Sequence, residues 1–369
     1  MSTARLNRVV GALLASHSGD ALGSTLESHS HDSIAARYPD GLRDIVGGGP
    51  FGLTPGQATH DTDLTRAVLL AYLDASRIRA AGGAPDVAEH AARHMLKWLR
   101  GDWPERRLGR QPPHVGKTTL RGLQRYEQSG GRAEDGEGAG NGSLMRCLPT
   151  GLFVEDEDAI VDESMAISAV THGDERCRVS CAAYNIICAA LVAGRSPEEA
   201  VDRARAVAMR LEPKHTVADA ITLGRNLSVA NMAASGPSDL PSEASGFVLE
   251  SLALAVAAVL DKRPLEEVVI DIVRVGGDTD TNAAIAAGLL GARDGADAVP
   301  RRWVDRLQFG HDFSEIAKVI LETIDAQADA DAEAEAAAHE RLGRGCMEAA
   351  SRIPSEGPSR VAEAGHSVF

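Results

Sequence analysis

The chain has 369 residues, of which 44% are hydrophobic and 4% aromatic, enough apolar material to bury a full core. The scarcity of aromatics favours close-packed helices over a β-sandwich, whose core uses more aromatic and β-branched side chains. The formal net charge of -15, from 38 basic and 53 acidic residues, repels phosphate backbones, so we expect no nucleic-acid partner.

The cysteines and the N-terminus bear on the compartment. Five cysteines without a CxxC pair or a disulfide spacing pattern predict reduced thiols and a cytoplasmic location. The apolar run at residues 9–16 is broken by Gly19 and Asp20 with no convincing cleavage site after it, so we expect no signal peptide. No apolar stretch approaches the length of a membrane span, so we expect no membrane partner.

The first predicted helix covers residues 6–26. Its apolar side chains fall on one stripe, and it ends in small residues around Asp20, with Glu27 directly after it. This pattern predicts a helix that packs against the core and carries carboxylates at one end. Residues 28–58 are rich in Gly, Pro, His and Asp, and we expect them to form a loop.

An oxygen-rich cluster, Thr59-His60-Asp61-Thr62-Asp63, opens the next predicted helix, which is apolar over residues 67–73. Threonine and aspartate are common N-cap residues, so the cluster could simply cap the helix. Alternatively, it could meet a second cluster of the same kind, far away in the sequence, at one metal centre. The composition leaves both interpretations open.

Helical periodicity continues along the rest of the chain, and no stretch alternates with period two, so we expect no sheet. The further predicted helices cover residues 86–100, 118–127, 157–170, 176–193, 197–211, 216–233 and 245–260.

Two connections between these helices could bear function. The glycine-rich stretch 130–143 precedes Leu144, and exposed amides before a helix can cradle a phosphate, although a mobile surface loop fits equally. His172 lies in the junction 171–174, where a lone histidine is more often a helix cap than a catalyst.

The stretch Gly276-Gly277-Asp278-Thr279-Asp280-Thr281-Asn282 gathers hard oxygen donors in a short space. The apolar residues 268–275 precede it, and a run of small residues that allow close helix packing follows it. The two glycines let the backbone approach whatever the oxygens hold. Capping needs one such residue, whereas this stretch offers four, so it predicts a metal or phosphate site at the mouth of a buried helix.

The composition changes from Asp325 onward. Alanine, aspartate and glutamate dominate as far as His339, which predicts an exposed helix, and the residues after Arg352 have the composition of disordered chains. We therefore expect one catalytic domain at residues 1–324 and an acidic, partly disordered tail at 325–369.

Five blocks, taken together and in order, resemble the ADP-ribosylglycohydrolases, a family that includes the dinitrogenase-reductase-activating glycohydrolase and the ADP-ribosyl-acceptor hydrolases. The resemblance runs from about Arg8 to Ile324 and implies an all-α fold, a single compact orthogonal helical domain. The blocks are Gly19-Asp20-Ala21-Leu22-Gly23 with Glu27, Thr59-His60-Asp61-Thr62, Gly140-Asn141-Gly142-Ser143-Leu144-Met145-Arg146, Thr171-His172, and Gly276-Gly277-Asp278-Thr279-Asp280-Thr281-Asn282.

The resemblance also implies a site. It assigns two ions, Mg²⁺ or Mn²⁺, to a centre with Asp280 as the bridge, and it gives catalytic roles to Glu27, Asp61 and Asp278. The implied metal set is Thr59, His60, Asp61, Asp278, Asp280 and Thr281. The implied substrate-binding set is Asp20, Gly140, Asn141, Gly142, Ser143, Met145 and His172.

The chain departs from the family pattern at His60, because the family usually has Thr-Asp-Asp-Thr at this block. Imidazole binds manganese and other transition metals but is a poor magnesium ligand. Three interpretations follow: a changed metal preference, a site for one metal, or a weakened enzyme. Asp63 lies close by in the sequence, but on a helix it would point about 200° away from Asp61.

The implied activity is metal-dependent hydrolysis of the glycosidic bond between ADP-ribose and a protein side chain, of the arginine or serine type. The expected partner is an ADP-ribosylated protein or a small molecule that carries ADP-ribose, bound by a monomer. Two alternatives use the same fold: an ADP-ribose-binding pseudo-hydrolase, which His60 favours, and an immunity protein that counters an ADP-ribosyltransferase toxin.

Overall fold

Two long helices from opposite ends of the sequence, α1 (Thr3–Gly23) and α14 (Thr279–Asp294), pack against each other at the centre of the fold. Glycines make this approach possible. A Cβ added to Gly19 would lie 2.4 Å from the carbonyl oxygen of Ala283, and one added to Gly23 would lie 2.3 Å from that of Thr279. The two backbones therefore touch, and side chains at the ends of both helices are brought together.

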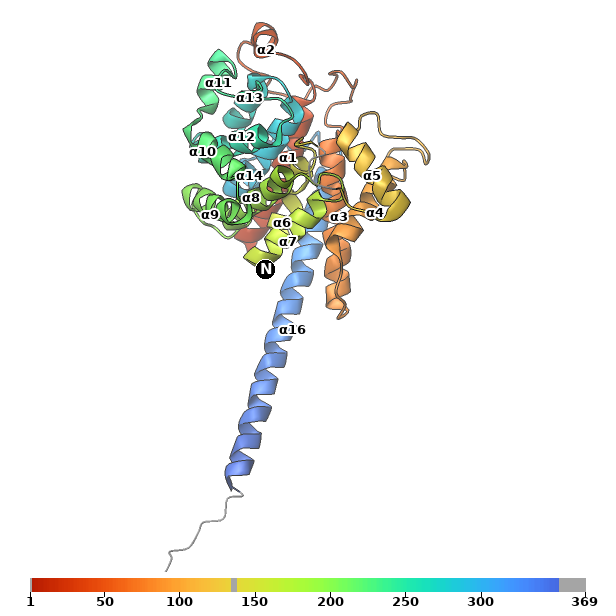
Figure 1. Cartoon of the computed structure of the whole chain (residues 1–369), viewed down its shortest axis with the longest axis vertical. Helices are drawn as coiled ribbons and strands as arrows, with labels where there is room; N and C mark the ends of the chain where they lie inside the picture. The colour runs from red at the N-terminus through yellow and green to blue at the C-terminus, as the bar shows by residue number, and fades with distance from the viewer. Residues whose placement is uncertain (1, 134–137, 352–369) are drawn as a thin grey trace, which may run out of the picture. The chain divides into compact units, whose positions relative to one another are not determined.

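The structure is a computed structural model that describes residues 2–133 and 138–351. Within these residues it contains α-helices, two 3-10 turns and isolated β-bridges, and no strand (Figure 1). The predicted all-α fold is confirmed. The other α-helices are α2 (His31–Arg37), α3 (His60–Ala80), α4 (Val87–Leu99), α5 (Lys117–Ser129), α6 (Leu148–Phe153), α7 (Glu157–Ser168), α8 (Glu175–Val192), α9 (Pro197–Leu211), α10 (Thr216–Asn226), α11 (Val229–Ser235), α12 (Val248–Leu260), α13 (Leu265–Val275), α15 (Arg301–Val304) and α16 (Gly310–Ser351).

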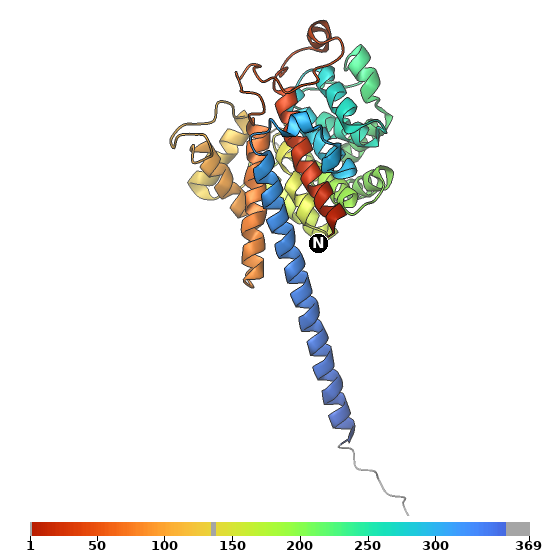
Figure 2. The same cartoon turned by 180° about the vertical axis from the view of Figure 1, so that it is seen from behind.

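The other helices surround the central pair. Helices α8, α12 and α13 contact α14 directly, and α3 packs on α4 on the other side of α1 (Figure 2). The largest side chains that are fully buried include Trp98, Trp303 and Tyr72, while alanine fills most of the contacts around α14. None of the helices in the described ranges combines the length and the apolar character needed to cross a bilayer.

The chain falls into two units, Met1–Thr323 and Ile324–Phe369. The first part of α16 belongs to the first unit and buries Phe313, Ile320 and Leu321 in its core. In the second unit the chain is helical as far as Ser351, in keeping with the helix expected there. The disorder predicted after Arg352 lies outside the described residues.

The structure differs from the predicted elements at several places, and helices α6, α13 and α15 were not predicted at all. The expected loop 28–58 contains α2, which Ser30 caps by accepting a hydrogen bond from the backbone N–H of Ser33. The predicted helix 216–233 is two helices, because the side chain of Ser228 caps a new start at α11. Helix α12 begins at Val248 rather than at residue 245, since the preceding residues pair with the glycine-rich loop through a bridge between Gly140 and Phe247.

Candidate functional site

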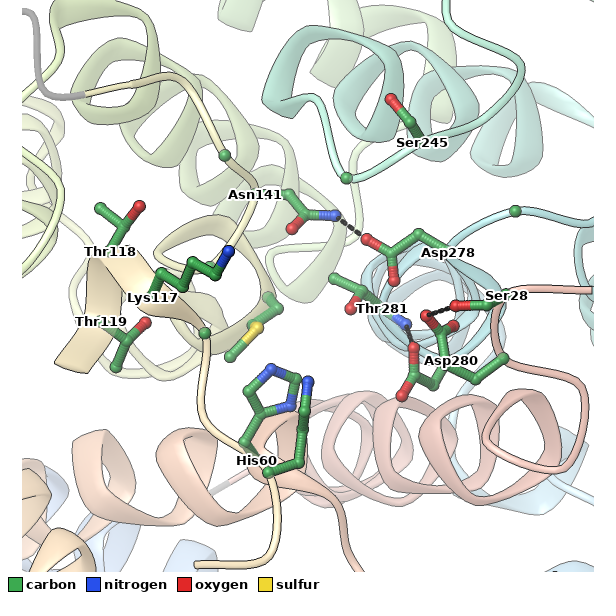
Figure 3. A pocket seen from close by; sticks show the side chains of 18 of the residues that line it. Ser28, His60, Lys117, Thr118, Thr119, Asn141, Ser245, Asp278, Asp280 and Thr281 are labelled. Carbon is green, nitrogen blue, oxygen red and sulfur yellow. Dashed lines mark hydrogen bonds between the residues drawn. The ribbon is translucent and has the colours of Figure 1, made fainter. Parts of the chain in front are cut away.

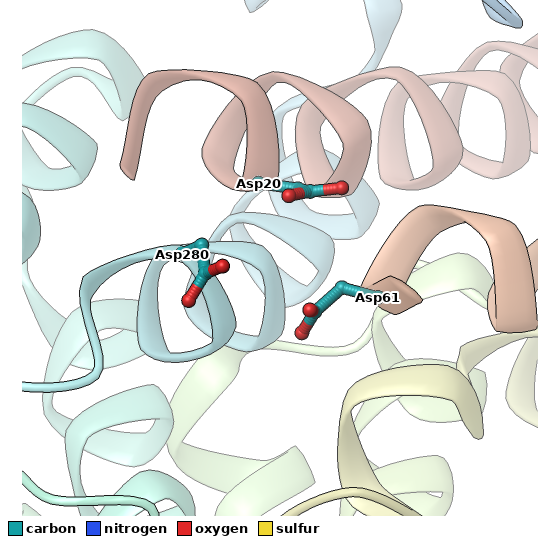
Figure 4. Close-up of side chains that lie close together, drawn as sticks. All are labelled: Asp20, Asp61 and Asp280. Atoms are coloured by element: carbon teal, nitrogen blue, oxygen red, sulfur yellow. The ribbon is translucent and has the colours of Figure 1, made fainter. Parts of the chain in front are cut away.

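Three helix ends meet at one place in the first unit. Asp20 lies in the last turn of α1, Asp61 in the first turn of α3, and Asp280 in the first turn of α14 (Figure 4). The N-terminus of a helix favours negative charge because its first amide groups have no partners within the helix. All three side chains are nonetheless buried, with exposed fractions of 0 to 2%.

The carboxylates form two overlapping groups. Asp20, Asp61 and Asp280 offer oxygens that all lie within 4.8 Å of one another, and so do Glu27, Asp278 and Asp280. Asp280 belongs to both groups and therefore lies between them. Oxygen donors at this spacing suit a hard divalent cation.

Hydrogen bonds hold the first of the two predicted clusters, the one around Asp61, against Asp20. Oδ2 of Asp20 accepts from the backbone N–H groups of Thr59, at 3.0 Å, and Thr62, at 3.3 Å, and from the Thr62 hydroxyl at 2.5 Å. The hydroxyl of Thr59 caps α3 by accepting from the N–H of Asp61 at 3.1 Å. The side chain of Asp278 caps nothing, although it stands at the N-cap position of α14. Capping thus accounts for Thr59 and leaves the carboxylates unexplained.

The charges of these carboxylates are poorly compensated. Burial, and then the charge of Asp61, raise the pKa of Asp20 to about 7. Burial, and then Glu27 and Asp61, raise the pKa of Asp278 to about 6. The pKa of Asp280 is raised well above its usual value by burial and by the carboxylates around it. Buried charges are costly unless they are paired or bind a metal.

Two buried carboxylate oxygens support a metal at this place. Oδ1 of Asp20 and Oδ1 of Asp61 have no hydrogen-bond partner anywhere in the described part of the chain. Because unpartnered buried oxygens are rare in native structures, each needs an explanation, and a divalent cation provides one. The donor set therefore fits such a cation.

His60 lies beside the first group rather than away from it. Its Nδ1 is 2.8 Å from Oδ2 of Asp61, an ion-pair distance, although the two atoms are not aligned for a hydrogen bond. Burial is the largest single influence on Asp61 and by itself would raise its pKa, but the charge of His60 together with the hydrogen bonds that the carboxylate accepts outweighs burial, and the pKa is lowered. The His60 ring also packs edge-on against His114, with the ring centres 4.4 Å apart.

Asp63 lies on α3 as Asp61 does, but its side chain points away from the carboxylate groups. Its carboxylate accepts hydrogen bonds from the indole N–H groups of Trp98 and Trp103, both at 2.7 Å, and pairs with Arg106 at 3.0 Å. Its role is to hold the segment after α4 onto α3. It therefore does not replace the carboxylate that His60 displaces.

The second carboxylate group is tied to α1 and to the glycine-rich loop. Glu27 accepts a hydrogen bond from the N–H of Thr279 at 3.0 Å. Asn141 donates through Nδ2 to Asp278 at 2.7 Å and to the hydroxyl of Ser251 at 3.0 Å. Asn141 thus joins the glycine-rich loop to the acidic end of the site.

A cleft of about 540 Å³ opens from the carboxylates. Figure 3 shows Lys117, Thr118 and Thr119 on one wall and Asp278, Asp280 and Thr281 on the opposite one. This volume is typical of a site for a small ligand. The cleft is lined by Glu27, Ser28, His60, His114, Gly116, Lys117, Thr118, Thr119, Gly140, Asn141, Gly142, Met145, His172, Ser242, Glu243, Ser245, Gly246, Gly277, Asp278, Asp280 and Thr281.

A buried arginine supports the glycine-rich loop from below. Arg146 is fully buried and donates to the carbonyl of Gly142 at 2.7 Å and to the hydroxyl of Thr171 at 2.6 Å. The same hydroxyl lies 2.7 Å from Nδ1 of His172, whose ring packs under Gly142. Burial, and then Arg146, lower the pKa of His172 to about 3. His172 is therefore neutral at physiological pH and can serve as a hydrogen-bonding group rather than as an acid.

Four residues of the expected site lie behind the cleft wall. Asp20 and Asp61 are buried in the first carboxylate group, and Thr59 caps the helix that carries Asp61. The hydroxyl of Ser143 accepts a hydrogen bond from Ser168 at 2.9 Å beneath the loop. The remaining expected residues line the cleft.

The sequence analysis missed the wall formed by the start of α5. Lys117 is the first residue of α5, and Gly116 at its N-cap leaves the first amides without a side-chain cap. A glycine followed by a lysine at the start of the predicted helix 118–127 was the available signal. It was weak, because residues 106–116 before it are basic and contain prolines, which indicates only a loop.

The chain is similar to known proteins over nearly the whole first unit. The family described as ADP-ribosylglycohydrolase matches residues 1–330. The ADP-ribosyl-dinitrogen reductase glycohydrolase of Rhodospirillum rubrum is 29% identical over 87% of this chain and 95% of its own length. The ADP-ribosylarginine hydrolase Tri1 of Serratia proteamaculans is 26% identical over 85% of this chain and 78% of its own.

A solved structure agrees with these relatives. The chain titled "ADP-ribosylglycohydrolase-related protein complex" superposes with a TM-score of 0.69 and 26% identity. The match covers 87% of this chain and 99% of the other.

Proposed function

The chain belongs to the ADP-ribosylglycohydrolase family, which is a family of glycosidase-type hydrolases, and we propose that it cleaves the N-glycosidic bond between ADP-ribose and an arginine side chain of a protein. The observation that carries this proposal is the pair of carboxylate groups sharing Asp280 at the deep end of the cleft. The arginine linkage is supported by the Tri1 relative, whose name specifies ADP-ribosylarginine.

The metal is proposed to be Mg²⁺ or Mn²⁺. The residues that would hold it are Asp278, Asp280 and Thr281 from α14 and its cap, with Thr59 and Asp61 from the start of α3. When bound, the metal would supply charge stabilisation and orientation for oxygens of the distal ribose or a water. Two ions are expected, and one ion is the alternative that His60 favours, because its imidazole stands at the edge of the first carboxylate group.

The protein's own residues would place the substrate along the cleft. Lys117 and the uncapped amides at the start of α5 would bind the diphosphate. The amides of the Gly140–Gly142 loop, which lies next to Thr119, and the neutral His172 would contact the ligand beside α5. The distal ribose would then reach Glu27 and Asp278.

Glu27 and Asp278 would act on the glycosidic bond. One oxygen of Glu27 is fixed by the N–H of Thr279, and the other accepts a hydrogen bond from the hydroxyl of Ser28. Glu27 could thus take a proton from the attacking water or assist departure of the guanidine. Both carboxylates would also stabilise the positive charge that develops on the ribose ring in an oxocarbenium-like transition state.

The test is release of ADP-ribose from an ADP-ribosylated arginine substrate, measured after chelation and with Mn²⁺ or Mg²⁺ restored. We expect release that requires a metal and falls at least about a thousandfold in the Asp280→Ala variant. Asp158→Asn is the control, because Asp158 is almost fully exposed on α7. Binding of the substrate without release under either metal would rule out the hydrolase.

That outcome would support the second candidate function, an ADP-ribose-binding protein without turnover. His60 is the observation that favours it, because an imidazole at this place competes with a metal for Asp61. Titration calorimetry with ADP-ribose would detect the binding directly. If this candidate holds, binding persists while release stays absent with every divalent metal tried.

A further inference from the structure

A second cavity of about 420 Å³ adjoins the acidic end of the cleft. The two share Ser28, Glu243 and Gly277 as a common edge. Beyond this edge the cavity lies between the start of α2, with His31 and Asp32, and the segment after α11, which includes Ser238. None of the roles proposed above uses it.

The common edge is a firm ridge of main chain. The N–H of Ser28 donates to the carbonyl of Gly277 at 3.0 Å, and the N–H of Gly277 donates to the carbonyl of His29 at 2.9 Å. A Cβ added to Gly277 would lie 2.5 Å from the carbonyl oxygen of Ala244. Three chain segments therefore interlock at this ridge, and a ligand crossing it meets a fixed surface.

The ridge lies next to the residue assigned to the bond that is cleaved. Glu27, the acid assigned to that bond, directly precedes Ser28 in the chain, and Figure 3 shows Ser28 on the far side of the cleft from Lys117. In the binding mode proposed above, the diphosphate of ADP-ribose lies at Lys117 and the distal ribose reaches Glu27. Whatever is attached to the distal ribose must therefore continue past Glu27, over the ridge.

Another cavity touches the cleft near His60, but it is a less suitable exit. His60 and His114 stand between the two, and their rings pack edge to face with centres 4.4 Å apart. An acceptor would have to displace both rings to pass. The cavity beyond Ser28 needs no such movement, because only the ridge separates it from the cleft.

The charge of the second cavity indicates which acceptor it fits. Asp32 and Glu243 both carry exposed carboxylates, and no lysine or arginine is found among the described residues that line the cavity. Opposite charge across an interface favours encounter and correct register. The lining therefore suits a cationic chain segment.

We propose that this cavity binds the residues that flank the modified arginine, and that it selects acceptor proteins with basic side chains next to the modification. This inference rests on the proposed function, since it needs ADP-ribosylarginine in the cleft. Such a cavity would make the protein selective among modified proteins, rather than a hydrolase of every ADP-ribosylated arginine.

The experiment compares three substrates: free ADP-ribosylarginine, a peptide with one ADP-ribosylated arginine between lysines, and the same peptide with glutamates in their place. Asp32→Lys reverses the charge on one wall of the cavity and Ser238→Lys adds a positive charge on the other, both at exposed positions that do not line the cleft. Asp158→Lys is the matched control on α7.

We expect the lysine peptide to be hydrolysed with a kcat/KM three- to tenfold, roughly, above that of the glutamate peptide at low salt. Each cavity variant should remove this preference through KM, while free ADP-ribosylarginine is cleaved at the wild-type rate. The control should keep the preference. Equal kcat/KM for the two peptides, or a preference that both cavity variants retain, would overturn the proposal.

Binding separates this inference from the proposed function. The Kd of each peptide is measured in EDTA, where no turnover occurs, so a protein that fails to hydrolyse any substrate still reports on the cavity. Tighter binding of the lysine peptide than of the glutamate peptide, abolished by Asp32→Lys, would support the subsite even if no substrate is hydrolysed. Equal Kd values reject it, whatever the free substrate does.

Discussion

At the scale of single residues, the site is defined by carboxylates that the fold buries together. Asp20, Asp61 and Asp280 come from three helices, and two of their oxygens lack partners in the described structure. Among the residues that the structure describes, His60 is the basic group in contact with Asp61, at 2.8 Å. These contacts lead to two predictions about individual side chains.

Replacing His60 with aspartate should shift the metal preference toward magnesium. A second carboxylate beside Asp61 provides the oxygen ligand that Mg²⁺ prefers, and it removes an imidazole that suits Mn²⁺ better. We expect the ratio of Mg²⁺- to Mn²⁺-supported ADP-ribose release to rise by about tenfold, with a matching change in Mg²⁺ affinity by calorimetry. His60→Asn, which adds no carboxylate, is the control, and an equal response of both variants would contradict the prediction.

Replacing Asp63 with asparagine should destabilise the protein without touching the metal ligands. The carboxylate holds Trp98, Trp103 and Arg106, so its loss weakens two hydrogen bonds and leaves Arg106 without its partner. We expect a loss of about 2–4 kcal/mol in the free energy of unfolding, measured by urea denaturation. The exposed Asp158→Asn should change it by less than about 0.5 kcal/mol. A similarly small change in unfolding free energy for both variants would show that the contacts of Asp63 with Trp98, Trp103 and Arg106 contribute little to stability.

At the scale of elements, the approach of α1 to α14 decides where the carboxylates stand. The contact is made by glycine backbones, so a methyl group at Gly19 has no room beside the carbonyl of Ala283. Helix ends that carry Asp20 and Asp280 depend on this contact for their separation.

Gly19→Ala should therefore affect both stability and activity. The added methyl group forces the helices apart, which we expect to cost about 1–3 kcal/mol of unfolding free energy and to lower ADP-ribose release at saturating metal. Gly116→Ala is the control for stability, since its Cβ would meet only the Thr119 hydroxyl at 3.7 Å. If Gly19→Ala unfolds like the wild type in a denaturant series, the backbone contact is not the constraint described.

Element by element, the sequence predicted helices where apolar periodicity was long, as in α1, α8 and α14. It failed where short polar residues decide the boundary, because the cap at Ser228 and the short helix α2 leave almost no periodic signal. That the two clusters around Asp61 and Asp278 meet was one of the two interpretations that their chemistry left open, the other being helix capping alone. The wall at Lys117 was not predicted, since its place depends on how α5 packs rather than on any local pattern.

At the scale of the whole molecule, the buried carboxylates make stability depend on pH. The pKa of Asp20 in the folded chain is raised to about 7 and that of Asp278 to about 6, above the usual aspartate value. A carboxyl group with a raised folded pKa binds its proton more tightly in the folded state. The stability it contributes is thus present at low pH and is lost as the pH rises through the folded pKa.

The buried aspartates should consequently make the metal-free protein less stable as the pH rises from about 5.5 to 8, against the opposite contribution of buried His17 and His172, whose pKa values are lowered to about 3. We expect the thermal midpoint in EDTA to fall across this range, and Mn²⁺ to raise it more at pH 8 than at pH 5.5, because the cation binds the ionised carboxylates. Differential scanning calorimetry at several pH values measures both. A midpoint that rises with pH in EDTA would show that other groups dominate.

The glycine contact between α1 and α14 has one more consequence. Because main chain meets main chain at Gly19 and Gly23, no side-chain volume enters the distance between the two helices. Substitutions elsewhere in the core can alter packing without passing that change on to the gap between Asp20 and Asp280. The separation of these two buried carboxylates is therefore set by main chain, so the side chains around the two helices are freer to vary than Gly19 and Gly23.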